Sequence, residues 1–132
     1  MTRLLFDTTF LIDAERSADE LHELIEDDDD VAVAAVTIAE LRVGALLAEG
    51  RRRTTRTAYV DDVIATIPAL GYDLEVAEAH AALLVEVRAQ GKPRGAHDLI
   101  IAATARAFDR TIVSADSAAF RNLPGIKIRG HR

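Results

Sequence analysis

The segment RLLFDTTFLID, residues 3–13, determines how the rest of the sequence is interpreted. Three apolar residues run from Leu4 to Phe6, Asp7 follows at once, and apolar residues resume at Phe10. This order predicts a short buried strand that passes into a helix at a carboxylate. Asp7 is then either a polar residue of a surface turn, such as a helix cap, or a ligand in a metal site at the end of the strand. The remaining sequence has to decide between the two.

Length and composition set the class of protein. The chain has 132 residues, of which 49% are hydrophobic and 29% are charged, as in an ordinary globular protein. We expect one domain over residues 1–132. The sequence has no cysteine, which excludes disulfides and thiolate chemistry and suits a cytoplasmic protein. No apolar run approaches the roughly 18 residues of a membrane span, so we expect no membrane association.

The charge is unevenly distributed. The net charge of −6, from 22 acids and 16 bases, argues against tight, indiscriminate binding of nucleic acid. The acidic run EDDDD at 26–30 lacks the spacing of a calcium-binding loop and predicts a solvated turn. Positive charge is concentrated in the segment RRRTTR. This segment is a candidate surface for positioning phosphates, and a solvated helix face or a contact with a partner protein explains it equally well. Its basic residues are Arg51, Arg52, Arg53 and Arg56.

Strand and helix patterns alternate along the chain. This alternation predicts an α/β fold with a mainly parallel sheet between helical layers. Ser17 is a suitable cap for one of the helices, and Gly50 a suitable end for another. Strands are predicted at 3–7, 31–36, 111–114 and 126–129, an extended piece at 69–73, and helices at 9–15, 17–26, 37–50, 53–67, 75–90 and 98–108, with a short helix at 117–123.

Four acids occur where a strand passes into a helix or just inside a helix start: Asp7, Glu40, Asp98 and Asp116. Taken singly, each has a structural explanation. Asp7 and Asp116 suit N-caps, and Thr37 with Glu40 forms a T-x-x-E capping box. Asp98 in a first turn suits the helix dipole.

Taken together, the four acids indicate a different role. Ligands of open α/β sheets bind in the crevice beyond the carboxyl ends of the strands, where these side chains are expected. Carboxylates gathered there repel one another unless a cation lies between them. Oxygen ligands suit hard divalent ions, and the absence of cysteine argues against a soft metal.

The sequence resembles the PIN-domain ribonucleases, and particularly the VapC toxins of bacterial and archaeal toxin–antitoxin pairs. The resemblance runs nearly end to end. Each motif alone is weak, but four in the family's order are specific, and they imply a PIN-like three-layer α/β/α sandwich. The motifs are LLFDTTFLID at 4–13, TIAELRVG at 37–44, DLIIAATA at 98–105 and SADSAAF at 114–120.

The resemblance also implies a set of site residues. Many relatives carry a further acid shortly after the fourth one, where this chain has AAF at 118–120, which leaves open whether one or two metal ions bind. Glu40 would complete the metal site through water or would position or deprotonate the nucleophile. The implied catalytic and metal-binding residues for Mg²⁺ or Mn²⁺ are Asp7, Glu40, Asp98 and Asp116, supported by the hydroxyl groups of Thr8 and Ser114.

The implied activity is metal-dependent endoribonuclease cleavage by the toxin of a toxin–antitoxin pair. The substrate would be tRNA or rRNA, and cleavage would inhibit translation. The implied partner is a small VapB-like antitoxin whose C-terminal segment blocks the acidic site, often with an arginine. A homodimer is usual among such toxins, and the apolar faces of the helices at 53–67 and 75–90 are candidate interfaces.

Other classes of protein share parts of this pattern. A catalytically silent PIN-like module would only bind a partner or RNA, and a PIN nuclease of RNA processing would share the acids without being a toxin. A receiver domain requires adjacent acids after its first strand, where Asp7 is followed by two threonines, and a haloacid-dehalogenase phosphatase requires D-x-D there. The four histidines show no zinc-site spacing, although His97 borders Asp98.

Overall fold

The fold begins with the passage from strand to helix at Asp7. In the computed structural model, which describes residues 1–130, β1 spans Thr2–Phe6 and α1 spans Thr8–Arg16. The backbone N–H of Phe10 donates to Asp7 Oδ1 at 2.8 Å. Asp7 is therefore the N-cap of α1, and it satisfies one of the N–H groups that a helix start leaves without a partner.

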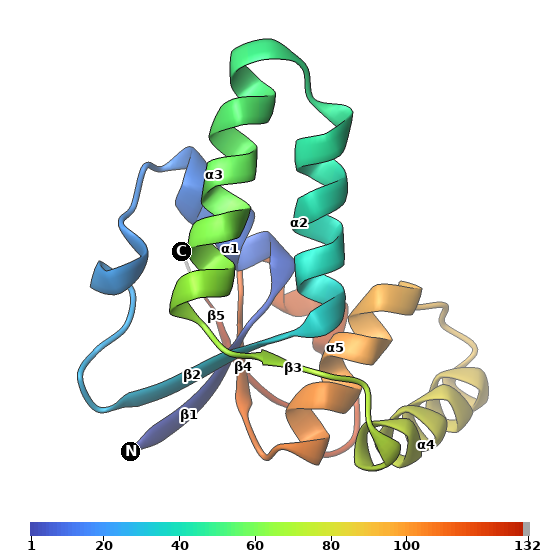
Figure 1. The fold of residues 1–132 in the computed structure, drawn as a ribbon. Helices are drawn as coiled ribbons and strands as arrows, with labels where there is room; N and C mark the ends of the chain where they lie inside the picture. Colours follow the sequence, from blue (N-terminus) through green and yellow to red (C-terminus); the bar gives the residue numbers. More distant parts are fainter. Residues whose placement is uncertain (131–132) are drawn as a thin grey trace.

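Five strands form one parallel sheet, as predicted. The strand order is β3-β2-β1-β4-β5, and every neighbouring pair is parallel (Figure 1). β1 lies at the centre, where Leu4 is paired with Val31 on one side and Thr111 on the other. Because the strands are parallel, their carboxyl ends lie at one edge of the sheet. The other strands are β2 Asp29–Ala34, β3 Ala69–Leu70, β4 Thr111–Ser114 and β5 Lys127–Gly130.

Helices cover both faces of the sheet, which gives the predicted α/β/α sandwich (Figure 1). Leu4 and Phe6 of β1 belong to a buried cluster with α1, α2 and α3. Leu5 belongs to a second cluster with α4 and α5. The two clusters follow from strand geometry, since successive side chains point to opposite faces. The remaining helices are α2 Ala35–Leu47, α3 Gly50–Thr66, α4 Leu74–Gln90 and α5 Ala96–Ala107, with 3₁₀ turns η1 Leu21–Glu23 and η2 Ser117–Phe120.

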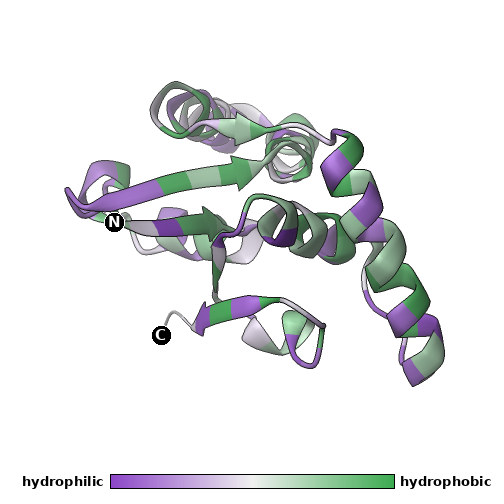
Figure 2. Ribbon diagram, turned by 90° about the horizontal axis from the view of Figure 1, so that it is seen from below, coloured by the Kyte–Doolittle hydropathy of each residue, from purple (hydrophilic) through white to green (hydrophobic). Residues whose placement is uncertain are grey.

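Apolar residues are concentrated between the three layers. In Figure 2, β2 changes from hydrophilic at its acidic start to hydrophobic where it runs between the helices, and its last four residues are buried. Of the helices in residues 1–130, none has the length and apolar character needed to cross a bilayer.

The predicted helix at 17–26 is wrong. Ser17 ends α1, and its N–H donates to the carbonyl of Asp13 at 3.0 Å. Ala18 then has a φ of 55°, a left-handed conformation that no following helix turn can continue. Only the single turn of η1 forms, and its buried Leu21 holds the segment against the α1–α3 cluster.

The predicted capping box at the start of α2 is also wrong. β2 ends at Ala34, which occupies the N-cap position without a side-chain bond. Thr37 lies inside the helix and is buried, so Glu40 is not needed for capping. The expected end of this helix at Gly50 is misplaced as well, since α2 ends at Leu47 and Gly50, with a φ of 58°, begins α3. Most other boundaries differ from prediction by one to three residues.

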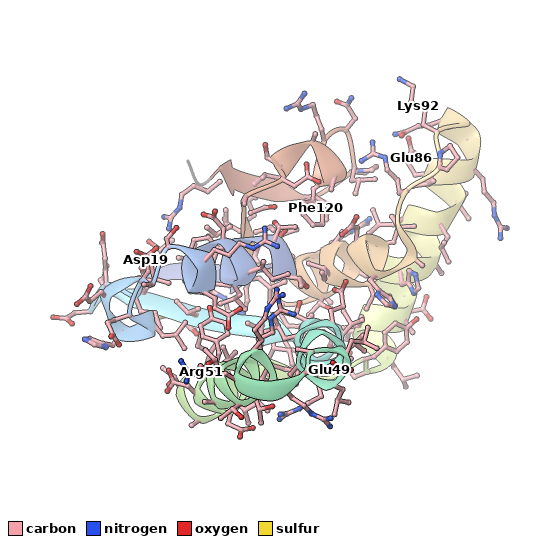
Figure 3. All side chains as sticks on the ribbon, turned by 90° about the horizontal axis from the view of Figure 1, so that it is seen from above. Asp19, Glu49, Arg51, Glu86, Lys92 and Phe120 are labelled. Atoms are coloured by element: carbon pink, nitrogen blue, oxygen red, sulfur yellow. The ribbon has the colours of Figure 1, made fainter. Side chains whose placement is uncertain are left out.

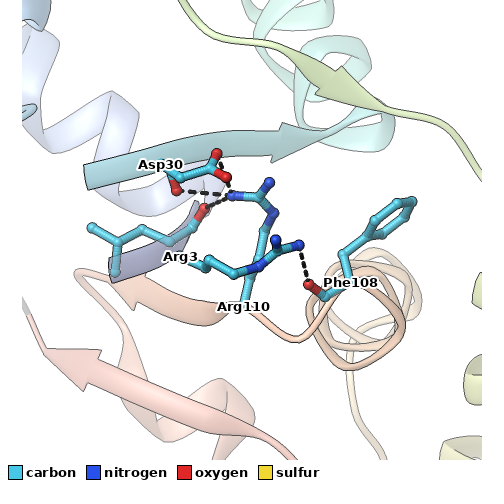
Figure 4. Close-up of polar contacts among 5 residues, drawn as sticks. Arg3, Asp30, Phe108 and Arg110 are labelled. Carbon is cyan, nitrogen blue, oxygen red and sulfur yellow. Dashed lines mark hydrogen bonds and ion pairs between the residues drawn. The ribbon is translucent and has the colours of Figure 1, made fainter. Parts of the chain in front are cut away.

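A buried arginine links neighbouring strands at the amino end of the sheet. Arg110 is 8% exposed, and its Nη1 lies 2.8 Å from the carbonyl oxygen of Asp30, 3.0 Å from Asp30 Oδ1 and 3.2 Å from the carbonyl oxygen of Leu4 (Figure 4). Arg3 donates to the carbonyl of Phe108 at 2.8 Å beside it. These bonds connect β1, β2 and the turn before β4, on the side opposite the carboxyl edge.

We predict that Arg110→Ala lowers the free energy of unfolding by about 2–3 kcal/mol. The change leaves two backbone carbonyls and the Asp30 carboxylate without their charged donor. Arg3→Ala, which removes one exposed bond, should cost less than about 1 kcal/mol. Urea unfolding of both variants measures the difference. Equal losses for the two arginines would contradict the role given to Arg110.

Candidate active site

The topology brings the four predicted acids to the carboxyl edge of the sheet. Asp7 follows β1 and Asp116 follows β4, and these two strands are adjacent. Glu40 lies in α2, which leaves the end of β2, and Asp98 lies in the first turn of α5. The acids come from positions up to 109 residues apart. They share one neighbourhood, because the charges of the other three all raise the pKa of Asp98.

Asp7 is the most deeply buried of the acids, at 2% exposed. Thr9 Oγ1 donates to both of its carboxylate oxygens, at 2.9 and 3.0 Å. The hydroxyl of Ser114 and the N–H of Phe10 donate to it as well. Burial nevertheless raises the pKa of Asp7, against the opposing effect of these bonds, and the charge of Asp116 raises it further. The donors thus orient the carboxylate without fully replacing its lost hydration.

Thr8 orients Glu40. Its hydroxyl donates to Glu40 Oε1 at 2.7 Å and lies 3.2 Å from Thr37 Oγ1. The second carboxylate oxygen, Oε2, lies 3.5 Å from Nδ1 of His97. Consecutive threonines therefore serve different acids, since Thr8 contacts Glu40 and Thr9 contacts Asp7. Sequence reasoning placed Thr8 at the site but did not identify Thr9 or Thr37.

Asp98 is partly buried and close to its own helix start. Burial is the main cause of its raised pKa, followed by the charges of Glu40, Asp7 and Asp116. A Cβ at Gly95 would lie only 2.8 Å from Asp98 Oδ2. The carboxylate therefore occupies space that is available because residue 95 has no side chain.

Ser114 connects the two acids that follow the central strands. Its hydroxyl donates to Asp7 and accepts the backbone N–H of Asp116 at 2.9 Å. Asp116 is exposed and stands before η2, and within the described chain its carboxylate makes no capping bond. The prediction that Ser114 supports the site is thus consistent with its position, while the cap expected from Asp116 does not form.

The donor set suits a hard divalent cation. The four acids offer only carboxylate oxygens, which Mg²⁺ and Mn²⁺ accept. The raised pKa values of Asp7 and Asp98 indicate repulsion and desolvation that a cation would relieve. Within residues 1–130, however, no three acidic, histidine or cysteine side chains are oriented to hold one ion together. Asp7 and Glu40 accept hydrogen bonds from hydroxyl groups of the chain, which hold their carboxylates in place.

A groove lined by one of the four acids, Glu40, also contains one arginine of the predicted basic surface, Arg56. It has a volume of about 190 Å³, and Glu40, Arg16 and Arg56 are among its lining residues. Arg56 donates to the carbonyl of Gly44 at 3.3 Å. Tyr59, also in the lining, donates to the carbonyl of Leu11 at 2.6 Å. Its pKa is raised by burial and by nearby acids, so its hydroxyl keeps its proton. The other basic residues of this surface are exposed: Arg51, Arg52 and Arg53.

Two known proteins have sequences similar to that of this chain. Toxin FitB of Neisseria gonorrhoeae is 33% identical over 96 residues, which cover 70% of this chain and 69% of that protein. VapC ribonuclease Y4jK of Sinorhizobium fredii is 33% identical over 94 residues, 67% and 66% of the two chains.

Solved structures show the same fold. A chain of the VapBC-5 toxin–antitoxin structure from Mycobacterium tuberculosis matches with a TM-score of 0.80 and 29% identity, covering 99% of this chain and all of that one. A chain of VapBC2 from Rickettsia felis matches with a TM-score of 0.89 at 18% identity, over 99% and 100% of the two chains. The family model of the PIN domain matches residues 4–126. The chain therefore belongs to the PIN-domain family, alongside the VapC and FitB toxins.

Proposed function

We propose that the protein is a divalent-metal-dependent endoribonuclease that acts as the toxin of a toxin–antitoxin pair. The observation that carries the proposal is the burial of Asp7 at the carboxyl edge, beside three other acids from separate segments. Burial of a carboxylate is unfavourable and is typical of sites in which the charge has a function. The similarity to Toxin FitB and to a VapC ribonuclease supports the same activity.

The residues of the chain have separate roles in this proposal. Asp7, Asp98 and Asp116 hold Mg²⁺ or Mn²⁺, and Glu40 completes the site or positions the attacking water. When bound, the ion polarises the scissile phosphate and lowers the pKa of a water molecule. Thr9 and Ser114 fix the direction of Asp7, and Thr8 fixes that of Glu40.

The proposed substrate is RNA, with tRNA and rRNA as the first candidates. Cleavage of this RNA stops translation in the cytoplasm. The arginines near the start of α3 position its phosphates, and one of them, Arg56, shares a groove with Glu40. Guanidinium groups suit this role because each can donate two parallel bonds to a phosphate. The residues concerned are Arg51, Arg52, Arg53 and Arg56.

The partner is a VapB-like antitoxin. The names of the VapBC and FitAB complexes among the structural relatives support this assignment. An arginine of the antitoxin would suit the carboxylates, of which Glu40 also lines the groove. We also propose a homodimer through the exposed apolar side chains of α3 and α4, where Ile64, Leu74 and Val85 are 48%, 84% and 67% exposed.

The first prediction from the proposed function concerns the acids. With Mg²⁺ or Mn²⁺ the purified protein should cut total RNA or tRNA into discrete fragments, and EDTA should abolish the cleavage. Asp7→Asn retains a helix cap yet should reduce the rate by more than about 100-fold, since loss of even a ligand's supporting partner costs 10–100-fold. Asp116→Asn should do the same. Asp109→Asn, an exposed acid paired with Lys127, is the matched control. A silent binding module would bind metal without cleaving RNA.

The second prediction concerns stability and pH. The raised pKa of Asp98 means that the folded protein keeps this proton more readily than the unfolded chain, so the ionised carboxylate destabilises the fold at neutral pH. In EDTA, Asp98→Asn should therefore be more stable than wild type by about 0.5–1 kcal/mol. Wild type gains stability as the pH falls through the raised pKa, so the difference should vanish at about pH 4.

Urea unfolding in EDTA at several pH values measures this difference. Excess Mg²⁺ should reverse the order, because ligand binding stabilises only the protein that retains the site. A variant that is less stable at neutral pH in EDTA would show that Asp98 serves the helix start rather than a metal site.

The third prediction concerns Gly95. Alanine at this position would bring its Cβ to 2.8 Å from Asp98 Oδ2, and the flexible carboxylate would move because the backbone accepts alanine, at a φ of −59°. We expect a rate loss of about tenfold or more with a change in unfolding free energy below about 0.5 kcal/mol. Gly71→Ala, which adds a Cβ in open space, is the control. Unchanged cleavage by Gly95→Ala would show that the position of Asp98 is not critical.

A further inference from the structure

A second basic surface lies on the other side of the acids. It is a concavity of about 450 Å³ between the loop that joins α4 to α5 and the segment around η2. Its lining contains three cationic side chains and no carboxylate. In the view from above, Lys92 of this surface and Arg51 of the first lie on opposite sides of the molecule (Figure 3). The lining residues are Gln90, Lys92, Arg94, Ala118, Arg121 and Asn122.

The two segments of this surface are joined by hydrogen bonds. Arg94 donates through Nη1 to the carbonyl of Ala119 at 2.9 Å and through Nη2 to that of Arg121 at 2.6 Å. Gln90 Nε2 donates to the carbonyl of Asn122 at 2.9 Å, and also lies 3.4 Å from Glu86 Oε1. The concavity is therefore held in shape by the chain. Preorganisation of this kind lowers the entropy lost when a ligand binds.

The cations of this surface have no anionic partner. Among the arginines and lysines of residues 1–130, Arg42, Arg110 and Lys127 form ion pairs with aspartates. Among residues 1–130, no ion pair involves Lys92, Arg94 or Arg121. Lys92 and Arg121 are exposed. In a chain of net charge −6, such a group forms a local positive field within a mainly negative surface.

The position of the surface relates it to the acids. Arg94 precedes Gly95, which lies against the Asp98 carboxylate. Ala118 lies two residues after Asp116. On the opposite side, Glu40 lines the groove that continues to the first basic surface at Arg56. The acidic edge thus stands between two basic surfaces, as required if a chain of phosphates crosses it.

We propose that Lys92 and Arg121 form a phosphate-binding subsite that holds the RNA backbone on the α4–η2 side of the acids. This rests on the proposed function, which supplies the RNA. Lys92 and Arg121 donate to phosphate oxygens, and Arg94 fixes the segment that presents them. A phosphodiester chain fits this arrangement because it carries a negative charge at every nucleotide and can contact the basic surfaces on both sides of the acids.

The test measures binding separately from cleavage. A fluorescent single-stranded RNA is titrated in EDTA, where the proposed nuclease leaves it intact, at several KCl concentrations. The test variant is Lys92→Gln/Arg121→Gln. The matched control is Arg3→Gln/Lys127→Gln, which removes the same charge near the opposite end of the strands. A third variant, Lys92→Arg/Arg121→Lys, retains the charge. Thermal unfolding verifies that each variant is folded.

We expect the test variant to bind RNA about tenfold more weakly, with the slope of log affinity against log salt reduced by about 1.4, or 0.7 for each lost phosphate contact. The control and the charge-retaining variant should keep affinities near wild type. In the cleavage assay with metal, the test variant should raise KM more than it lowers kcat.

Three outcomes would overturn the subsite. They are an unchanged affinity and salt slope in the test variant, an equal loss in the control, and an absence of RNA binding by wild type. If the test variant keeps RNA binding but loses binding to a polyglutamate peptide, the concavity is a site for an acidic peptide instead. Failure of the proposed function is distinguishable, since wild type would then bind RNA through these residues without cutting it.

Discussion

Burial of one carboxylate, that of Asp7, is the constraint on which fold and site both depend. Moving an ionised carboxylate out of water costs several kcal/mol unless donors replace the solvent. Here the donors are the helix start of α1 and the hydroxyl groups of Thr9 and Ser114. The bond from the N–H of Phe10 begins the helix, and the bond from Ser114 fixes the end of β4 against the end of β1. The same atoms therefore define local structure and the floor of the acidic site.

The donors do not cancel the whole cost. The pKa values of Asp7 and Asp98 both remain raised, by burial first and by neighbouring acids second. Repulsion of this kind has no structural benefit, and in a site of purely structural caps the acids would be expected further apart. The opposite end of the sheet shows the contrast, since the Asp30 carboxylate there is paired with Arg110 inside the fold. An unfavourable arrangement is retained where function requires it.

Much of this arrangement could be predicted from sequence, because local patterns specify it. Alternating apolar runs indicated the parallel sheet, and the acids that follow them indicated its carboxyl edge. For Asp7 the two interpretations proved compatible, since it caps α1 and also lies in the acidic site. The prediction of a helix at 17–26 was wrong because alanine does not favour the left-handed backbone conformation that Ala18 adopts. Specific contacts between residues distant in sequence could not be predicted, and the ion pair of Arg110 with Asp30 is the clearest case.

The two basic surfaces also differ in whether they could be predicted from the sequence. The first is visible as RRRTTR because its arginines are consecutive, whereas the second combines Lys92 with Arg121 and exists only once α4 and η2 are packed together. Charges separated by more than about 8 Å are largely screened at physiological salt, so a net charge of −6 does not determine what each surface attracts. Between two positive surfaces, an edge of four carboxylates repels phosphate until a cation neutralises it. If the protein cleaves RNA as proposed, this charge pattern attracts the flanks of the RNA strand and makes close approach of the scissile phosphate depend on the metal.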